Sequence, residues 1–199
     1  MPHTLKLIIV GRDGILNEFH EDHIKAPEEW IAVPGALEAL ARLNHAGWHV
    51  VVATNQSGIG RGMIDMAAVN AVHAHMLRSL QAAGGRIDAV FFCPHTPEDN
   101  CDCRKPLPGM MLDIARRYSV DLRLVPMVCD TLRDLQAAQA AGCEPHLVRS
   151  GRAAPVDPAQ IAAWLEQVPG TFVHRDLAEL VNHMLEREHL RDSQSAPLA

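Results

Sequence analysis

Long apolar runs and an excess of positive charge are both missing from this sequence. It has 18 Lys and Arg residues against 24 Asp and Glu residues, which gives a net charge of −6 at pH 7. Because nucleic acids are bound by basic surfaces, this balance argues against nucleic acid as a main partner. No apolar run approaches the roughly 20 residues that a membrane helix needs, and residues 1–6 carry no export signal. We therefore expect a cytoplasmic protein with no membrane partner.

The sequence also lacks internal repeats, low-complexity tracts and any long connection between its early predicted strands. With 199 residues, 48% of them hydrophobic, the chain is long enough for one domain with a sizeable core. We expect a single domain over residues 1–191, without a large inserted cap, and a disordered tail over residues 192–199. A compact domain of this size is compatible with a monomer.

Short apolar runs alternate with amphipathic segments along the chain. Strands covered on both faces are predicted at residues 7–10, 48–53, 88–92, 124–129 and 146–148, with a last edge strand at 171–174. Helices are predicted at residues 36–47, 66–85, 109–118, 132–142, 158–168 and 176–190. Strands that alternate with helices imply parallel crossovers, so the expected fold is α/β, a layered Rossmann-like parallel sheet.

Polar clusters follow four of these strands, where an open parallel sheet places its chemistry. They are Asp13, residues 54–58 (Thr-Asn-Gln-Ser-Gly), the pair Arg104 and Lys105, and Asp130 with Asp134. Carboxylates, a hydroxyl, backbone amides and two cations are a set suited to phosphoryl transfer. Each cluster alone also has a structural explanation, as a turn, a helix cap or a solvated loop. Their order along the chain favours the functional interpretation.

Three of the five cysteines crowd into one short loop, residues 93–103. Cys93 and His95 stand two residues apart, and Cys101 and Cys103 repeat that spacing. Three thiolates and one imidazole make a closed tetrahedral set suited to structural Zn²⁺, and a reducing compartment favours metal over disulfide. A chance cluster of reduced cysteines is the alternative. We expect the zinc loop to hold Arg104 and Lys105 rigidly.

The combined motifs resemble the haloacid dehalogenase superfamily of phosphatases, and within it the D-glycero-D-manno-heptose 1,7-bisphosphate phosphatases, with histidinol-phosphate phosphatases close by. The segments that carry the resemblance, over roughly residues 7–150, are GRDGI, TNQSGIGRG, CPH, CDCRKPLPGM and DTLRDLQAA. The resemblance implies phosphomonoester hydrolysis in the synthesis of lipopolysaccharide core heptose. It also implies a sugar phosphate as the small-molecule partner.

In this family the first motif carries two carboxylates, and the resemblance assigns their roles. The first attacks phosphorus, and the second, here Asp13, protonates the leaving group and then activates water. Mg²⁺ is held by the first carboxylate, the carbonyl of Asp13 and the fourth-motif Asp130. This sequence has Gly11 in the first position, so no covalent intermediate can form there. We expect weakened magnesium binding and turnover lowered by about 10⁴–10⁶-fold.

Other positions depart from the family pattern as well. Ile15 replaces a small or hydroxylated residue, Cys129 replaces glycine, and Thr131 stands where Lys or Ser is common. Three explanations of Gly11 stay open at this point. It is a natural change in a degraded or repurposed site, an engineered substitution that traps substrate, or a sequence error.

The other residues of the predicted site still indicate that it binds a phosphate group. The resemblance implies catalytic roles for Asp13, Thr54 and Lys105. The substrate-binding set that it implies is Thr54, Asn55, Gln56, Ser57, Arg104 and Lys105. Residues 17–30 would form a flap over the pocket, in which His20 and His23 are loop residues rather than ligands. Arg61 is a weaker candidate for substrate contact.

Three functions follow from these observations. The first is a phosphatase of the heptose bisphosphate type with impaired turnover. The second is a non-catalytic sugar-phosphate binding protein, and the third is a zinc-stapled scaffold without a ligand.

Overall fold

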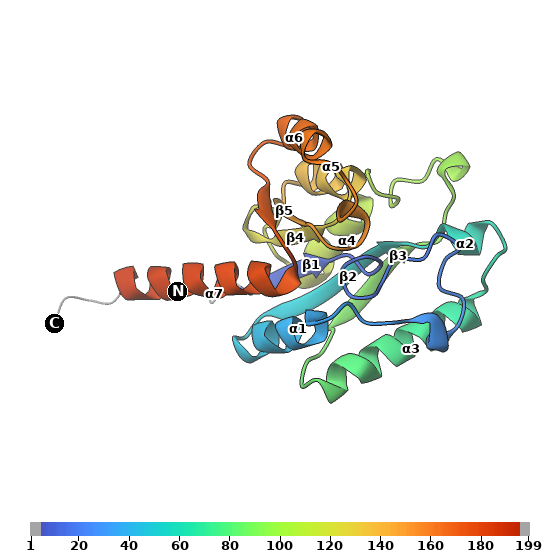
Figure 1. The fold of residues 1–199 in the computed structure, drawn as a ribbon, viewed down its shortest axis with the longest axis horizontal. Coiled ribbons are helices and arrows are strands. Elements are labelled where there is room, and N and C mark those ends of the chain that lie inside the picture. The colour runs from blue at the N-terminus through green and yellow to red at the C-terminus, as the bar shows by residue number, and fades with distance from the viewer. Residues whose placement is uncertain (1–4, 196–199) are drawn as a thin grey trace.

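A six-stranded parallel sheet forms the centre of the computed structural model, which describes residues 5–195 (Figure 1). Its strands lie in the order β3-β2-β1-β4-β5-β6, and every neighbouring pair is parallel. They are β1 (Leu7–Val10), β2 (His49–Asn55), β3 (Ala89–Cys93), β4 (Pro126–Cys129), β5 (Glu144–Val148) and β6 (Phe172–His174). The predicted α/β parallel sheet is confirmed.

Helices cover both faces of the sheet. They are α1 (Ala36–His45), α2 (Ser57–Gly60), α3 (Met66–Ala82), α4 (Gly109–Tyr118), α5 (Leu132–Ala141), α6 (Pro158–Gln167) and α7 (Leu177–Ser195). The buried side chains of α1, α3 and α7 pack on one face, and those of α4, α5 and α6 on the other. Figure 1 shows these two helical layers on either side of the strands.

The sequence of β1 explains why two cores form. Its four residues are all buried, and they alternate between the two faces. Ile8 and Val10 join the core under α1 and α3, whereas Leu7 and Ile9 join the core under α4 and α5. Side chains of a strand point alternately to opposite faces, so a continuous apolar run is what a doubly covered strand requires.

The element boundaries differ from the predicted ones by a few residues. The fourth strand begins at Pro126 rather than at residue 124, because residues Leu122–Leu124 form a short 3₁₀ helix. The fifth strand begins two residues earlier than expected, at Glu144. Helix α7 continues to Ser195, beyond residue 191, where the ordered domain was expected to end. The remainder of the predicted tail, residues 196–199, lies outside the described residues.

The strand order places the site. Since β1 lies between β2 and β4, the loops that leave the carboxyl ends of these three strands meet at one edge of the sheet. No helix within residues 5–195 has the length and apolar character that crossing a membrane requires.

Candidate active site

The predicted residues meet around one place at the carboxyl edge of the sheet. Gln56 Nε2 donates to Asp13 Oδ2 at 3.0 Å and to Thr54 Oγ1 at 2.9 Å. Arg152 joins Asp130 to the backbone of Asp13. Lys105, from the loop after β3, forms an ion pair with Asp134 at the start of α5. Contacts therefore connect residues that four different strands deliver.

Asp13 is held as a carboxylate by cationic and amide donors. Arg12 Nη2 donates to its Oδ1 at 2.8 Å, and Asn17 Nδ2 donates to the same oxygen at 3.1 Å. Burial alone would raise the pKa of Asp13, but the charge and hydrogen bonds of Arg12 outweigh it and lower that pKa. Asp13 is thus ionised at neutral pH, in the state of a proton acceptor.

Arg12 is itself buried, with 2% of its surface exposed. Its Nη1 lies 3.2 Å from Nε2 of His73 on α3. Burial, together with the Arg12 charge, lowers the pKa of His73 to about 4. Neutral His73 can therefore accept a hydrogen bond from Arg12, which fixes the guanidinium beside Asp13.

The space beside Gly11 is filled by Ile15. Gly11 is buried at the end of β1, and its amide donates to Val128 O at 3.3 Å. A Cβ atom built on Gly11 would lie 2.8 Å from Ile15 Cδ1, closer than such atoms normally approach. The Ile15 side chain therefore projects toward the space that a side chain at residue 11 would enter.

Lys105 is a second buried cation of the site, with 4% of its surface exposed. Its Nζ lies 2.7 Å from Asp134 Oδ1 and donates to Ala53 O at 3.0 Å. Burial alone would raise the pKa of Asp134, but the nearby Lys105 charge lowers it strongly. The backbone of Lys105 is clamped by Asn55, which donates to Lys105 O at 3.1 Å and accepts from Lys105 N at 3.2 Å.

Asp130 is fully buried and faces Arg152. Arg152 Nη2 donates to Asp130 Oδ1 at 2.6 Å, and Arg152 Nε donates to Oδ2 at 2.9 Å. The same Nη2 lies 3.3 Å from the backbone oxygen of Asp13. Burial on its own would lower the pKa of Arg152, but the hydrogen bonds and charge of Asp130 raise it.

The residues present fit a magnesium ion poorly. The two oxygen ligands that the resemblance implies, Asp13 O and the Asp130 carboxylate, do converge, and they are hard ligands of the right type. The third ligand position is Gly11, which has no side chain. The guanidinium of Arg152 lies between the two remaining oxygens, so a cation of the protein already neutralises them.

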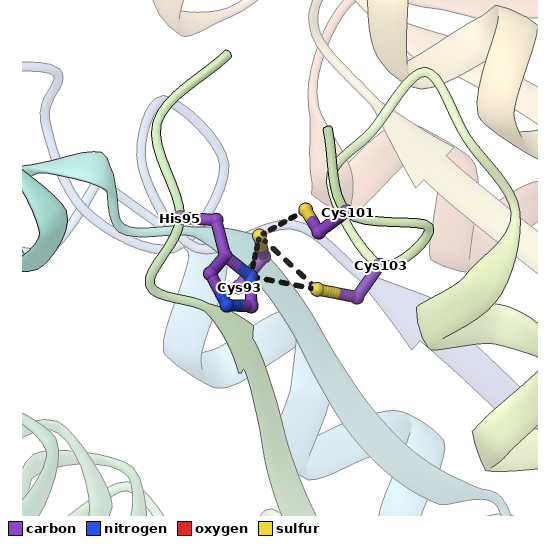
Figure 2. A group of neighbouring side chains, drawn as sticks. All are labelled: Cys93, His95, Cys101 and Cys103. Carbon is purple, nitrogen blue, oxygen red and sulfur yellow. Dashed lines mark hydrogen bonds between the residues drawn. The ribbon is translucent and has the colours of Figure 1, made fainter. Parts of the chain in front are cut away.

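Beside this site, the four predicted zinc ligands come together (Figure 2). One ligand atom each from Cys93, His95, Cys101 and Cys103 lies within 4.8 Å of all the others. Cys93 Sγ is 3.7 Å from Cys101 Sγ, close to the roughly 3.8 Å separation that tetrahedral Zn–S bonds of about 2.3 Å produce. The donor set and its spacing are consistent with structural zinc, and four protein ligands leave no open position.

A basic pocket lies between the zinc loop and Lys105. Its volume is about 470 Å³, and the residues that line it include Arg104, Arg133 and Lys105, whose ammonium group is paired with Asp134. Arg104 Nη1 donates to His95 O at 3.1 Å, so a zinc-loop carbonyl orients this side chain. Burial, with the charges of Arg152 and Arg104 adding to it, lowers the pKa of Arg133. Cations gathered in this way favour an anionic ligand.

The remaining predicted residues occupy the rim. Ser57 is buried at the start of α2, whereas Arg61, at the end of that helix, is exposed. In the predicted flap His20 is exposed and His23 is partly buried. The Phe19 ring of the same segment lies 5.1 Å from the Arg152 guanidinium carbon, so the flap does contact the site.

Sequence reasoning missed the roles of Arg12, Arg133 and Arg152. Arg12 could have been found, because it stands directly beside the motif carboxylate. Arg133 lies one residue before Asp134, and this position in the sequence does not indicate where the Arg133 side chain points. Arg152 contacts a carboxylate 22 residues away, and no periodicity or spacing in the sequence signals that contact.

Comparisons with known proteins identify the family of this chain. Residues 14–131 match the family model described as polynucleotide kinase 3 phosphatase, and residues 102–180 match the HAD-hydrolase-like model. The D-glycero-beta-D-manno-heptose-1,7-bisphosphate 7-phosphatase of Bordetella bronchiseptica is 52% identical over 92% of this chain and 99% of its own length. The protein of the same name from Pseudomonas aeruginosa is 42% identical over 90% of this chain and 98% of its own.

Solved structures lead to the same group. The crystal structure of the B. bronchiseptica D,D-heptose 1,7-bisphosphate phosphatase, complexed with magnesium and phosphate, has a TM-score of 0.84 and covers 92% of this chain and 99% of that one. The corresponding enzyme of Burkholderia thailandensis is 46% identical, has a TM-score of 0.69 and covers 90% of this chain and 98% of that one. This chain belongs to the family of D,D-heptose 1,7-bisphosphate 7-phosphatases within the haloacid dehalogenase superfamily.

Proposed function

We propose that this chain binds D,D-heptose 1,7-bisphosphate at the carboxyl edge of the sheet, in lipopolysaccharide heptose synthesis, and hydrolyses its 7-phosphate far more slowly than its relatives. The observation that carries the proposal is the bridge that Gln56 makes between Asp13 and Thr54, with Lys105 Nζ bonded to Ala53 O on the same strand. At the end of the neighbouring strand, Gly11 offers no nucleophile. The identity of 52% to a relative of that name supports the substrate.

Different residues of the site would contact different groups of the bound sugar phosphate. Lys105 Nζ bonds the carbonyl of Ala53, the residue that precedes Thr54 in β2. A phosphoryl group placed there would receive charge-assisted hydrogen bonds. Arg104 and Arg133, in the basic pocket, suit the second phosphate or the sugar hydroxyls. Asp13, which is ionised, would accept a proton from an attacking water or return one to a leaving alkoxide.

Gly11 removes the covalent route, because no side-chain oxygen is available to bond phosphorus. The Ile15 side chain projects toward the space beside Gly11. A site with binding groups and no nucleophile also suits the second candidate, a sugar-phosphate binding protein with no turnover at all.

The experiment is phosphate release from heptose 1,7-bisphosphate with excess Mg²⁺, measured for the parent, Gly11→Asp, and Gly11→Asp with Ile15→Thr. We expect the double variant to exceed the parent by about 10⁴–10⁶-fold. The single variant should gain less, because its Cβ meets Ile15. The matched control is Gly11→Asn with Ile15→Thr, which has the same shape without a nucleophile and should stay at the parent rate.

Each result separates the candidates. A parent that turns over at ordinary enzyme rates, about 1–10³ s⁻¹, would show the nucleophile argument to be wrong. Calorimetric binding of the sugar bisphosphate by the parent, without phosphate release by any variant, would establish the binding protein. If no variant bound the sugar bisphosphate or released phosphate, the zinc-stapled scaffold without a ligand would be the remaining candidate.

A further inference from the structure

The contacts of Arg152 differ from those of an ordinary surface ion pair. Its guanidinium bonds both carboxylate oxygens of Asp130, which is fully buried, and its backbone N–H donates to Asp130 Oδ2 at 3.1 Å. Nη2 also bonds the main-chain oxygen of Asp13 at 3.3 Å. These are the two oxygen groups that the family resemblance assigns to magnesium. One side chain therefore holds both sets of oxygens that a metal ion would otherwise hold.

The loop that carries Arg152 is built to approach the end of β1. Gly14 has a φ of +82°, and a Cβ on it would meet Asp130. Gly151 has a φ of +57°, and its missing Cβ leaves room for the backbone of Gly14. Ser150 Oγ adds a long hydrogen bond to Gly14 O at 3.4 Å. Two glycines thus let the two loops touch, which brings the Arg152 side chain to the strand tips.

Arg152 is also held from its outer side. Its guanidinium carbon lies 5.1 Å from the centre of the Phe19 ring, within the range of a cation–π contact. The side chain retains 25% of its surface exposed. Nη1 makes no hydrogen bond to another residue within the described range 5–195. The guanidinium is therefore fixed on one side and keeps donors available on the other.

We propose that the Arg152 guanidinium takes the place of the divalent cation in this chain, so that a phosphate monoester is bound without magnesium. This inference rests on the proposed function for its ligand. Gly11 removes one anionic ligand, and Arg152 neutralises the carboxylate that remains. A planar guanidinium is always charged and matches phosphoryl oxygens through paired donors, so it can supply the positive charge that a metal would give.

The proposal is tested by two titrations of the zinc-loaded protein in buffer freed of other divalent cations by a chelating resin. Mn²⁺ binding, followed by electron paramagnetic resonance, uses Mn²⁺ as a visible substitute for Mg²⁺. Inorganic phosphate binding is measured by calorimetry with and without about 10 mM MgCl₂, an excess over ordinary Mg²⁺ needs. The variants are Arg152→Gln and Arg152→Lys. Arg123→Gln, an exposed change at the opposite end of β4, is the matched charge control.

We expect the parent to bind Mn²⁺ only weakly, and its phosphate affinity to change less than about twofold with MgCl₂. Arg152→Gln should lose about tenfold or more of its phosphate affinity in metal-free buffer and regain it with MgCl₂. Its Mn²⁺ affinity should rise by about tenfold or more, because Asp130 becomes free to bind metal. Arg152→Lys should resemble the parent more than the Gln variant does, and Arg123→Gln should equal the parent.

Tight Mn²⁺ binding by the parent, or a phosphate affinity that rises about tenfold with MgCl₂, would overturn the assignment of Arg152 while leaving the proposed function intact. Absence of phosphate binding in every buffer would overturn the role of Arg152 in binding phosphate, and calorimetry with heptose 1,7-bisphosphate in the same buffers then shows whether the proposed function fails as well. Circular dichroism of Arg152→Gln separates a local effect from loss of fold. If this variant unfolds, an Arg152→Lys protein with magnesium-dependent phosphate binding would count against the proposal.

Discussion

The Cys/His cluster and the phosphate site are joined by a short stretch of chain, but they differ in how complete they are. The cluster has all four of its expected ligands within 4.8 Å. The phosphate site has Asp13, Thr54, Lys105 and Asp130, but residue 11, where the proposed function lacks a nucleophile, is glycine. The cluster therefore has every group that its proposed role requires, whereas the phosphate site has groups that suit binding without a side chain at residue 11 that could bond phosphorus. The two regions can be tested separately for this reason.

The largest effect should come from removing a ligand from the Cys/His cluster, the region that has all of its expected ligands. Cys103→Ser removes one of four zinc ligands, and we expect metal content to fall from about one equivalent to below half. The loop over residues 93–105 should then become sensitive to proteases, since metal binding supplies much of its stability. Metal analysis and limited proteolysis measure both effects. Cys143→Ser, a buried thiol outside the cluster, is the control and should keep its zinc. Equal zinc in both variants would exclude the four-ligand site.

The next largest effect concerns the ion pair of the incomplete region. Lys105→Met leaves buried Asp134 with only its longer 3.6 Å contact to Arg152, which should lower the free energy of unfolding by about 3 kcal/mol at pH 7. Lys105 keeps the folded pKa of Asp134 well below its usual 3.8, so the pair stabilises the parent above about pH 4 and this contribution is lost as the pH falls further, through the folded pKa. Denaturant melts should thus show the difference in stability between the two proteins shrinking progressively below about pH 4. A constant difference across that range would contradict the pair.

A smaller effect should come from removing the hydrogen bonds that hold the Lys105 backbone between the Cys/His cluster and the phosphate site. Asn55→Ala removes both hydrogen bonds to the Lys105 backbone, and we expect a loss of about 1–3 kcal/mol. Zinc should stay bound, whereas phosphate affinity should fall, because Lys105 is no longer held beside Thr54. Calorimetry with sugar phosphate measures the change. Asn55→Asp keeps the acceptor and loses the donor, so its phosphate affinity should lie between those of the parent and Asn55→Ala. Unchanged phosphate affinity in Asn55→Ala would show that Asn55 does not position Lys105.

The smallest effect tests the packing at the missing nucleophile. Gly11→Ala should cost less than about 1 kcal/mol, because its Cβ meets only Ile15 Cδ1, the end of a flexible side chain that can rotate aside. Ile15→Val removes that methyl group, so the double variant should be more stable than the sum of the single effects by about 0.5 kcal/mol. Denaturant unfolding of the four proteins completes the cycle. Strict additivity would mean that residues 11 and 15 do not share this space.

Much of the fold could be predicted from the sequence, and the reason is local. The runs at β1 and β2 are apolar throughout, as strands buried on both faces must be, and the helices begin and end near clear signals such as Gly142. The meeting of Asp13, Thr54 and Asp130 followed from the rule that parallel strands present their carboxyl ends to one edge. The zinc ligands could be predicted from their spacing.

Two features could not be predicted, because both depend on contacts between distant or unpatterned atoms. Arg152 reaches Asp130 only since the backbones of Gly14 and Gly151 touch, and loop geometry of this kind leaves no periodic trace in the sequence. The direction of the Ile15 side chain depends on how the turn after β1 closes. The residue type at position 15 could be noted from the sequence. It did not indicate that the Ile15 side chain lies against Gly11.

The contact between Ile15 and Gly11 has a consequence for the history of the chain. A carboxylate introduced at position 11 would first meet the terminal methyl group of Ile15, which is the end of a flexible side chain and can rotate aside. A single substitution followed by one rotamer change would therefore be enough to place a carboxylate there. Under the proposed function, the path from a binding site to a working phosphatase is then one mutational step long.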